Sequence, residues 1–328
     1  MKVLKEWTAL GRVRQPLLLA AGFFDGVHRG HRKILAETIA RARASGGQAW
    51  VLTFDVHPLT VLRPDAAPPL LTSLRHKLKL LERLDLDGCL VLPFRRALAD
   101  LEPDDFVRRL HRHMPTLSEV LVGRNWRFGR GGAGTPQRLV RLGREWGFRV
   151  VIVRDARRKA EIVSSTRIRT ELARGNLREA GLLLGRPFSV LGTVTRGRTV
   201  GRTLGYPTAN LDVANEVLPT RGVYGVRALL ADRLADGVLN LGVRPTFPGA
   251  HGAPPVLELH LLDCKRNLYG REIEVFFLEK LRNERRFASA RELAGQIAAD
   301  VRAARKILCR RPTKKLEESL YRRRGRTL

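Results

Sequence analysis

Apolar runs of strand length alternate with helical runs through the first half of the chain, and this alternation limits the possible folds more than any other feature. Such alternation predicts a parallel sheet wrapped by helices. The expected strands are Leu17–Ala21, Ala49–Phe54, Cys89–Phe94, Glu119–Gly123 and Arg149–Val153. The expected helices are Arg32–Ala44, Leu74–Leu84, Asp104–Arg112 and Arg138–Trp146.

The pattern changes after Pro187, where short β-type runs follow one another at turn-rich spacing. This spacing indicates a small barrel or sandwich. The expected strands are Phe188–Thr195, Val223–Leu230, Asp236–Leu241, Val256–Leu262 and Ile273–Leu281. One amphipathic helix, opened by a capping box at Ser289 and Glu292, is expected to pack its apolar stripe on this domain.

The break at Leu184–Pro187 divides the chain into an α/β domain and a mostly β domain. We therefore expect domains over residues 1–184 and 185–309, followed by a basic tail over 310–328. The tail carries eight basic residues against Glu317 and Glu318 and lacks a clear apolar stripe, which predicts a solvated, flexible extension.

Composition places the chain among soluble globular proteins, with 44% hydrophobic and 28% charged residues. No apolar run approaches the ~20 residues needed to cross a bilayer, and charged residues interrupt the N-terminal stretch where a signal peptide needs an apolar core. Cys89, Cys264 and Cys309 are widely spaced and odd in number, which argues against disulfides and a zinc site. We expect a cytoplasmic protein with no membrane partner.

The net charge of +29 arises from 61 Lys and Arg against 32 Asp and Glu. It predicts attraction to polyanions and a salt-sensitive surface. The basic residues are spread along the chain and no nucleic-acid-binding motif accompanies them, so phosphorylated substrates are the favoured explanation. A nucleic-acid-binding or regulatory protein is the alternative of a different class, with the tail as its one localised feature.

The stretch Ala21–Ile34 reads as a strand end, a tight turn and a helix whose first turn carries His28 and His31. A helix start offers free N–H groups and partial positive charge, which suits an anion such as a triphosphate. Gly22, Gly26 and Gly30 allow a ligand to approach closely. A bare HxGH also fits an ordinary βα turn with exposed histidines, but the whole run GFFDGVHRGH is more specific.

Further motif-like residues follow other strands, at the sheet edge where ligands bind in such folds. His57 follows the second strand, where a structural proline turn is as good an explanation as a catalytic role. Asn125 follows the fourth strand and precedes glycines that spell GxGxxG at Gly129–Gly134. We interpret this glycine-rich stretch as a mobile basic lid or binding loop. We reject a dinucleotide-binding motif because no βαβ context follows the glycines.

The stretch Ser164–Arg169 opens a short helix that ends at Gly175. Its hydroxyls either cap the helix or, with Arg167 and Arg169, grip phosphate, and the sequence leaves both possibilities open. A capping box from Asn176 to Glu179 opens the next helix.

The stretch Gly192–Asn210 is rich in glycine and arginine and reads as a hairpin loop able to lie over phosphates. It is not a P-loop, because one residue is missing between the glycines and arginine stands in place of lysine. Thr208 and Asn210 offer neutral oxygens that suit Mg²⁺ shared with ATP phosphates. Glu258 lies on a strand and is by default a solvent-facing residue.

With these motifs in place, the chain resembles the bacterial bifunctional riboflavin kinase/FMN adenylyltransferase (FAD synthetase) family from about Leu17 to Leu308. GFFDGVHRGH and VSSTRIR match the adenylyltransferase half. Matches to the kinase half are Gly192–Asn210, Arg221–Tyr224, Asn240–Thr246, Glu258–Asp263, Leu268–Gly270 and Leu281–Phe287. The resemblance implies a Rossmann-like nucleotidyltransferase domain, a flavokinase β-barrel, and riboflavin, FMN, FAD and ATP as ligands, with no obligate protein partner and no primary nucleic-acid partner.

The resemblance also implies roles for individual residues. His28 and His31 are expected to bind ATP phosphates during adenylyl transfer, and Glu258 to take the proton of the riboflavin 5′-hydroxyl. The implied ATP site of the first domain consists of Gly22, Phe24, Asp25, Gly30, Asn125, Ser164, Ser165, Thr166 and Arg167. The implied ATP site of the kinase consists of Gly197, Gly201, Thr208 and Asn210, the last two holding Mg²⁺.

Two departures from the family pattern lie in the first domain. Val56 stands where the family has proline, and Asn125-Trp126 where an Asp-Phe pair is common. They leave open an alternative in which the kinase is active and the adenylyltransferase is weak or lost.

Overall fold

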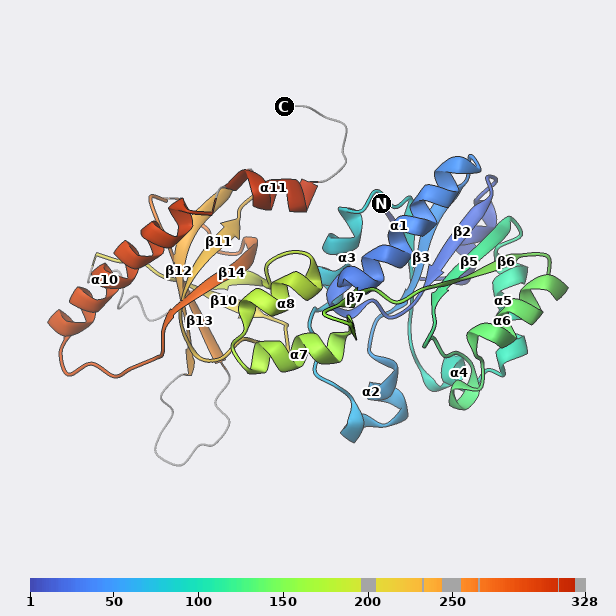
Figure 1. The fold of residues 1–328 in the computed structure, drawn as a ribbon, viewed down its shortest axis with the longest axis horizontal. Helices are drawn as coiled ribbons and strands as arrows, with labels where there is room; N and C mark the ends of the chain where they lie inside the picture. Colours follow the sequence, from blue (N-terminus) through green and yellow to red (C-terminus); the bar gives the residue numbers. More distant parts are fainter. Residues whose placement is uncertain (196–204, 232, 244–254, 265, 312, 322–328) are drawn as a thin grey trace. The chain divides into compact units, whose positions relative to one another are not determined.

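The computed structural model describes residues 1–195, 205–231, 233–243, 255–264, 266–311 and 313–321. The chain forms two compact units (Figure 1). The first contains Met1–Leu70, Leu74–Ser165 and Tyr321, and the second contains Leu71–Ser73 and Thr166–Leu320. None of the helices in the described ranges has the length and apolar character that crossing a membrane requires.

The first unit is built on a six-stranded sheet, all of whose pairings are parallel, in the order β1-β4-β3-β2-β5-β6. The strands are β1 (Lys2–Leu4), β2 (Leu17–Ala21), β3 (Gln48–Phe54), β4 (Gly88–Leu92), β5 (Leu117–Gly123) and β6 (Arg149–Val153). The main helices are α1 (Arg29–Ala44), α3 (Leu74–Glu82), α5 (Pro103–His113) and α6 (Pro136–Glu145). The predicted parallel sheet wrapped by helices is confirmed.

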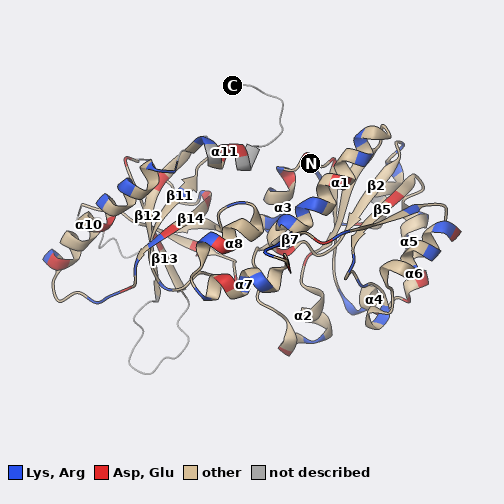
Figure 2. Cartoon of the chain, viewed as in Figure 1, with Lys and Arg blue, Asp and Glu red and all other residues tan. Residues whose placement is uncertain are grey.

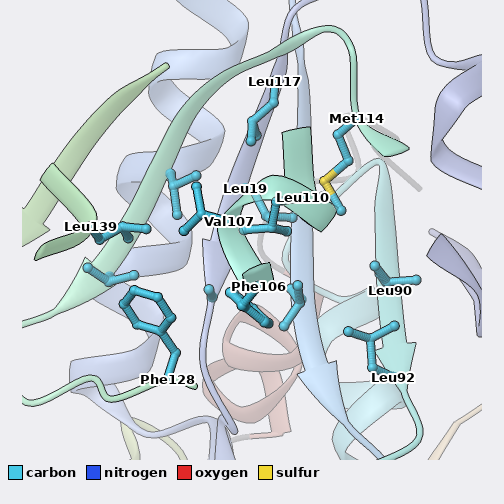
Figure 3. Close-up of a cluster of buried hydrophobic side chains, with 14 of the residues drawn as sticks. Leu19, Leu90, Leu92, Phe106, Val107, Leu110, Met114, Leu117, Phe128 and Leu139 are labelled. Atoms are coloured by element: carbon cyan, nitrogen blue, oxygen red, sulfur yellow. The ribbon is translucent and has the colours of Figure 1, made fainter. Parts of the chain in front are cut away.

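Alternation along the strands sends successive side chains to two cores, one on each face of the sheet. In β2, Leu17 and Leu19 enter the core covered by α5 and α6, which Figure 3 shows with Phe106, Val107 and Leu110 at its centre. Leu18 and Ala20 enter the opposite core, which α1 and α3 cover. The sheet is therefore buried on both faces, and its carboxyl edge is left for a site.

Shorter elements complete this unit. They are 3₁₀ turns η1 (Trp7–Arg12), η2 (Asp25–Val27), η3 (Pro64–Ala66) and η4 (Arg130–Gly132), helices α2 (Pro58–Leu62) and α4 (Arg96–Ala99), and a hairpin of β7 (Arg157–Arg158) and β8 (Glu161–Ile162). Strand β1 was not predicted, because its three residues lie in a stretch interrupted by charges.

The second unit is a closed barrel in the order β10-β13-β12-β11-β14-β9, with antiparallel pairing throughout. Its strands are β9 (Ser189–Thr195), β10 (Ala209–Val213), β11 (Gly222–Leu229), β12 (Leu234–Val243), β13 (Pro255–Leu261) and β14 (Glu272–Arg282). Of the two architectures that the spacing allowed, the barrel is the one formed. Strand β10 was missed because Pro207–Asn210 reads as a loop end.

Helix α10 (Ala290–Cys309) packs on the barrel as predicted, with Ala304 and Leu308 buried against Val223 and Phe276. Ser289 Oγ accepts from the Glu292 amide at 3.2 Å, and Glu292 Oε2 accepts from the Ala288 amide at 3.1 Å. The tail differs from the predicted flexible extension, because α11 (Thr313–Tyr321) is helical and buries Leu316 in the same cluster as Leu308.

Helices α7 (Ser165–Ala173) and α8 (Leu177–Leu184) group with the barrel. The compact units therefore divide at Ser165, before the boundary expected at Gly185. The physical reason is packing, since α8 contacts β14 of the barrel. The predicted cap of α8 is present, with Asn176 Oδ1 accepting from the Glu179 amide at 3.2 Å.

Candidate active sites

The turn between β2 and α1 is backbone-strained. Phe24 and Val27 have φ angles of 58° and 42°, in the left-handed region that non-glycine residues avoid and that is a clear outlier for a β-branched residue. Both side chains are buried among the residues packed between the sheet and α1. Strain of this kind persists only where surrounding packing enforces it, and it concentrates at functional sites.

His28 and His31 form a stacked pair at the start of α1. Their ring centroids lie 3.5 Å apart with an interplanar angle of 18°, and His28 Nδ1 accepts from the His31 amide at 3.3 Å. His28 is only 5% exposed and His31 is half-buried, so the interpretation of the pair as exposed histidines is wrong. A Cβ at Gly30 would lie 3.0 Å from His28 Cε1, which explains the glycine between them.

The environment keeps His31 neutral. Burial lowers the pKa of His31 well below 6.5, and the neighbouring His28 and Lys77 lower it further. Its Nδ1 is buried without a hydrogen-bond partner among the described residues. A buried polar atom left unpaired is costly, so this nitrogen beside the free N–H groups of a helix start fits a ligand rich in hydrogen-bonding oxygens.

The serine-threonine motif at the start of α7 reaches this turn through Ser165. Its Oγ donates to the backbone carbonyl of Asp25 at 3.1 Å, and Asp25 is itself buried. Ser164 is half-buried and Thr166 is exposed. Arg167 is ion-paired to Glu179 of α8 at 3.1 Å, a contact that the motif gave no reason to expect.

Asn125 lies exposed directly after β5, and the loop beyond it is fastened to the core. The Phe128 ring is buried, stacks 4.7 Å from Trp126, and pairs through its backbone with Gly134. The prediction that no βαβ unit surrounds the glycine-rich stretch is wrong, because β5, α6 and β6 do form one. The glycines nevertheless belong to this fastened loop, which ends before the α6 cap at Thr135.

His57 takes the structural role that the sequence left open. It precedes Pro58 at the start of α2, and its Nδ1 accepts from the Leu59 amide at 3.1 Å. The adjacent Val56 amide donates to Asp55 Oδ1 at 2.9 Å, a bond that a proline there has no N–H to make.

Lys77 is a buried residue beside the turn between β2 and α1 that the sequence analysis did not identify. It is 2% exposed on α3, and its Nζ donates to the carbonyls of Phe23 and Phe54 and to Thr53 Oγ1, each at 3.0 Å. A lysine within an amphipathic helix ordinarily lies on the solvent side, so the sequence carried no signal for this one.

In the barrel, Glu258 is the central member of a row of polar residues on three adjacent strands. It pairs in register with Asn210 of β10 on one side and with Asn240 of β12 on the other. Residues directly opposite in antiparallel strands share a face of the sheet with Cβ atoms about 5 Å apart. The row therefore presents one carboxylate between two amides, and Asn240 is a member that the predicted site did not include.

Asn210 fits the predicted magnesium ligand, because its Oδ1 is buried with no hydrogen-bond partner among the described residues. Thr208 is half-buried two residues before it. Neutral oxygens of this kind suit Mg²⁺ that is bound chiefly through ATP phosphates. No cluster of three or more His, Cys, Asp or Glu side chains suited to a metal occurs in the described ranges. Gly197, Gly201 and residues 244–246 of the Asn240 motif lie outside those ranges.

Comparisons with known proteins identify two domains in this chain. The FAD synthetase family model matches residues 12–167, and the riboflavin kinase model matches residues 184–308. The bifunctional riboflavin kinase/FMN adenylyltransferase of Escherichia coli K12 is 40% identical over 88% of this chain and 92% of its own length. Its namesake in Bacillus subtilis is 33% identical over 88% of this chain and 91% of its own length.

A crystal structure described as a macrolide-efflux protein from Streptococcus pneumoniae superposes with a TM-score of 0.80 at 27% identity, covering 93% of this chain and 99% of that one. The two family models and the relatives that cover most of the chain therefore point to the same family. The chain belongs to the bifunctional riboflavin kinase/FMN adenylyltransferase family, and it carries both the kinase and the adenylyltransferase domain.

Proposed function

We propose that the turn between β2 and α1 binds the ATP triphosphate for FAD formation, with His28 and His31 in contact with the phosphates. The observation that carries the proposal is the buried histidine stack at the start of α1, with one ring nitrogen unpaired among the described residues. The remaining contacts are assigned to Gly22, Phe24, Asp25, Gly30, Asn125, Ser164, Ser165, Thr166 and Arg167.

In this site the FMN phosphate oxygen attacks the α-phosphorus of ATP, the bond to the bridging oxygen breaks, and pyrophosphate leaves. No covalent enzyme intermediate is required, so positioning and charge stabilisation carry the step. Imidazole N–H groups that donate hydrogen bonds to phosphate oxygens supply that stabilisation without proton transfer.

In the barrel we assign Glu258 as the base for riboflavin phosphorylation. Its carboxylate takes the proton of the ribityl 5′-hydroxyl while that oxygen attacks the γ-phosphorus and ADP leaves. Thr208 and Asn210 are the residues that would hold Mg²⁺ with ATP, and the unpaired Asn210 oxygen supports this assignment. The ion neutralises charge on the transferred phosphoryl group when bound. Gly197 and Gly201 complete the proposed ATP contacts.

Incubation of the purified chain with riboflavin and Mg-ATP, followed by separation of the flavins, tests both assignments. We expect FMN to form and then be converted to FAD. Accumulation of FMN without FAD would instead support the alternative of an active kinase with a weak adenylyltransferase, which rests on Val56 and Asn125.

Two sets of variants separate the sites. Glu258→Ala is expected to abolish FMN formation from riboflavin while FAD still forms from added FMN. His28→Ala and His31→Ala are expected to show the reverse. Each variant is thus the folding control for the other domain, and loss of both activities in any one folded variant would contradict the assignment of two separate sites.

We further propose a cytoplasmic location and no obligate protein or nucleic-acid partner. The free thiols of Cys89, Cys264 and Cys309 support this location. The proposed domain limits remain residues 1–184 and 185–309, and the start of the riboflavin kinase family model at residue 184 supports this division.

A further inference from the structure

Lys77 is buried below the strained turn and is fully hydrogen-bonded there. An ammonium has three N–H donors, and the three acceptors at 3.0 Å are the carbonyls of Phe23 and Phe54 and the hydroxyl of Thr53. Thr53 Oγ1 in turn donates to the Phe23 carbonyl at 2.9 Å. The ammonium also lies 4.1 Å from the centroid of the Phe23 ring, in cation–π distance.

These bonds join two segments that both lead to the first site. Phe23 lies immediately before Phe24, where the backbone turns left-handed on the way to His28 and His31. Phe54 ends β3, and Thr53 precedes it on the same strand. The Lys77 side chain on α3 therefore links the strained turn to the end of β3, because it donates hydrogen bonds to a backbone carbonyl of each segment.

None of the acceptors is an anion. All three are neutral, and burial raises the pKa of the nearby Cys89 thiol to about 12, so this group stays uncharged. A positive charge without an ion-pair partner among the described residues is thus held against Phe23, next to the strained turn. The ionisable groups that act on Lys77 or His31 from the surrounding elements are Asp25, His28, Asp55 and Cys89.

We propose that Lys77 is a positioning residue for adenylyl transfer, which holds the turn before His28 in its strained conformation and places a positive charge beside that turn. This inference rests on the proposed role of His28 and His31. It concerns a residue that lies outside every motif on which that role was assigned.

The test compares Lys77→Met with Lys79→Met in the full chain. Methionine keeps an unbranched side chain, one atom shorter than lysine, but removes the charge and the donors. Position 79 lies about half a turn around the same helix. In Lys77→Met we expect kcat for FAD formation from FMN and ATP to fall about 100-fold, as a displaced reactive group does. Riboflavin phosphorylation by the same molecules, and both activities of Lys79→Met, should stay at the wild-type level.

The pH profile distinguishes positioning from a merely structural role. Removing the charge raises the pKa of His31, so the acid limb of kcat for FAD formation should move to higher pH in Lys77→Met. A smaller fraction of folded protein would lower kcat and leave the limb in place. A wild-type kcat, or a lowered kcat with an unmoved limb, overturns the proposal.

Thr53→Val decides the matter should Lys77→Met not fold, because it removes one acceptor and leaves the charge. We expect kcat for FAD formation to fall about tenfold, the effect of one lost hydrogen bond, with the limb unmoved. Full activity in folded Thr53→Val contradicts the proposal. His31→Ala serves as the reference: if it retains FAD formation, the histidine assignment itself fails, whereas its inactivity beside an unaffected Lys77→Met refutes only the role of Lys77.

Discussion

Two basic side chains in the first unit are buried in surroundings that disfavour their charged forms. Burial lowers the pKa of Lys77 from 10.5 to about 8, and burial lowers the pKa of His31 well below 6.5. Because the unfolded chain protonates this amine more readily than the folded chain does, keeping Lys77 charged in the folded protein costs stability at neutral pH. A group held at such a cost fits a residue retained for activity.

The lowered pKa of His31 predicts how stability changes in weak acid. The unfolded chain binds a proton at His31 as the pH falls through 6.5, whereas the folded chain does not, so this contribution is complete above pH 6.5 and is lost below it. The loss is at most about 1.4 kcal/mol per pH unit for one group.

Urea unfolding at a series of pH values between 7.5 and 5 measures this effect. Wild type should lose more stability over the range than His31→Gln, which lacks the titrating ring. Equal slopes for the two proteins would mean that His31 is not protected from protonation.

Gly30 is expected to be intolerant of even the smallest side chain. A methyl group there would lie 3.0 Å from His28 Cε1 and 3.4 Å from the Val163 carbonyl, so the imidazole must move. We expect Gly30→Ala to reduce FAD formation about 100-fold, the effect of displacing a reactive group, with riboflavin phosphorylation unchanged. Gly11→Ala is the matched control in the same domain, because its backbone is not left-handed and the added atom would meet only the His113 carbonyl, at an ordinary contact distance of 3.8 Å.

For individual residues, the sequence motifs predicted which side chains lie at the first site, but not the hydrogen bonds and ion pairs that those side chains form. His28, His31 and Ser165 were identified from motifs, and their proximity to the turn is confirmed by the stack and the Ser165–Asp25 bond. The Lys77 contacts and the Arg167–Glu179 pair were not predicted, because each depends on how separate helices pack and leaves no local pattern.

Among the elements, α10 provides the clearest test of a local rule. Its cap bonds Ser289 Oγ to the Glu292 amide, and Ser→Ala at such positions costs about 1 kcal/mol. Ser289→Ala should therefore lower the unfolding midpoint of the barrel, measured by thermal denaturation. Ser289→Asp retains an acceptor and adds favourable charge at the helix start, so it should restore the midpoint.

Regular elements followed from periodicity wherever their hydrophobic pattern was long. The bounds of β2 and β6 agree with the sequence, and those of α3, α5 and α6 agree to within two residues. β1, β10 and α11 were missed, because short strands and a helix with one buried leucine acquire their structure from pairing and packing with distant segments.

In the whole molecule, the basic residues are not gathered into one patch of the fold that the structure describes. Lys and Arg are distributed over the elements of both units in Figure 2, and many form ion pairs with Asp and Glu. The substrates ATP and FMN are anions, so the field of +29 is expected to assist their approach.

This view predicts salt-sensitive kinetics. Raising ionic strength from 0.01 M to 0.15 M shortens the Debye length from about 30 to about 8 Å, so KM for ATP should rise in both reactions while kcat changes little. Steady-state assays at constant Mg²⁺ measure this. Unchanged KM, together with tight salt-dependent binding of duplex or RNA, would favour the nucleic-acid alternative.

The short strand β1 has a consequence for how the protein can be handled. It pairs its three residues Lys2–Leu4 with β4, whose five residues are all buried. A truncation or a tag that displaces it would leave β4 as an unprotected edge strand, open to pairing with another chain. The three residues of β1 therefore protect β4 from pairing with another chain, whereas the closed barrel has no open edge that requires such protection.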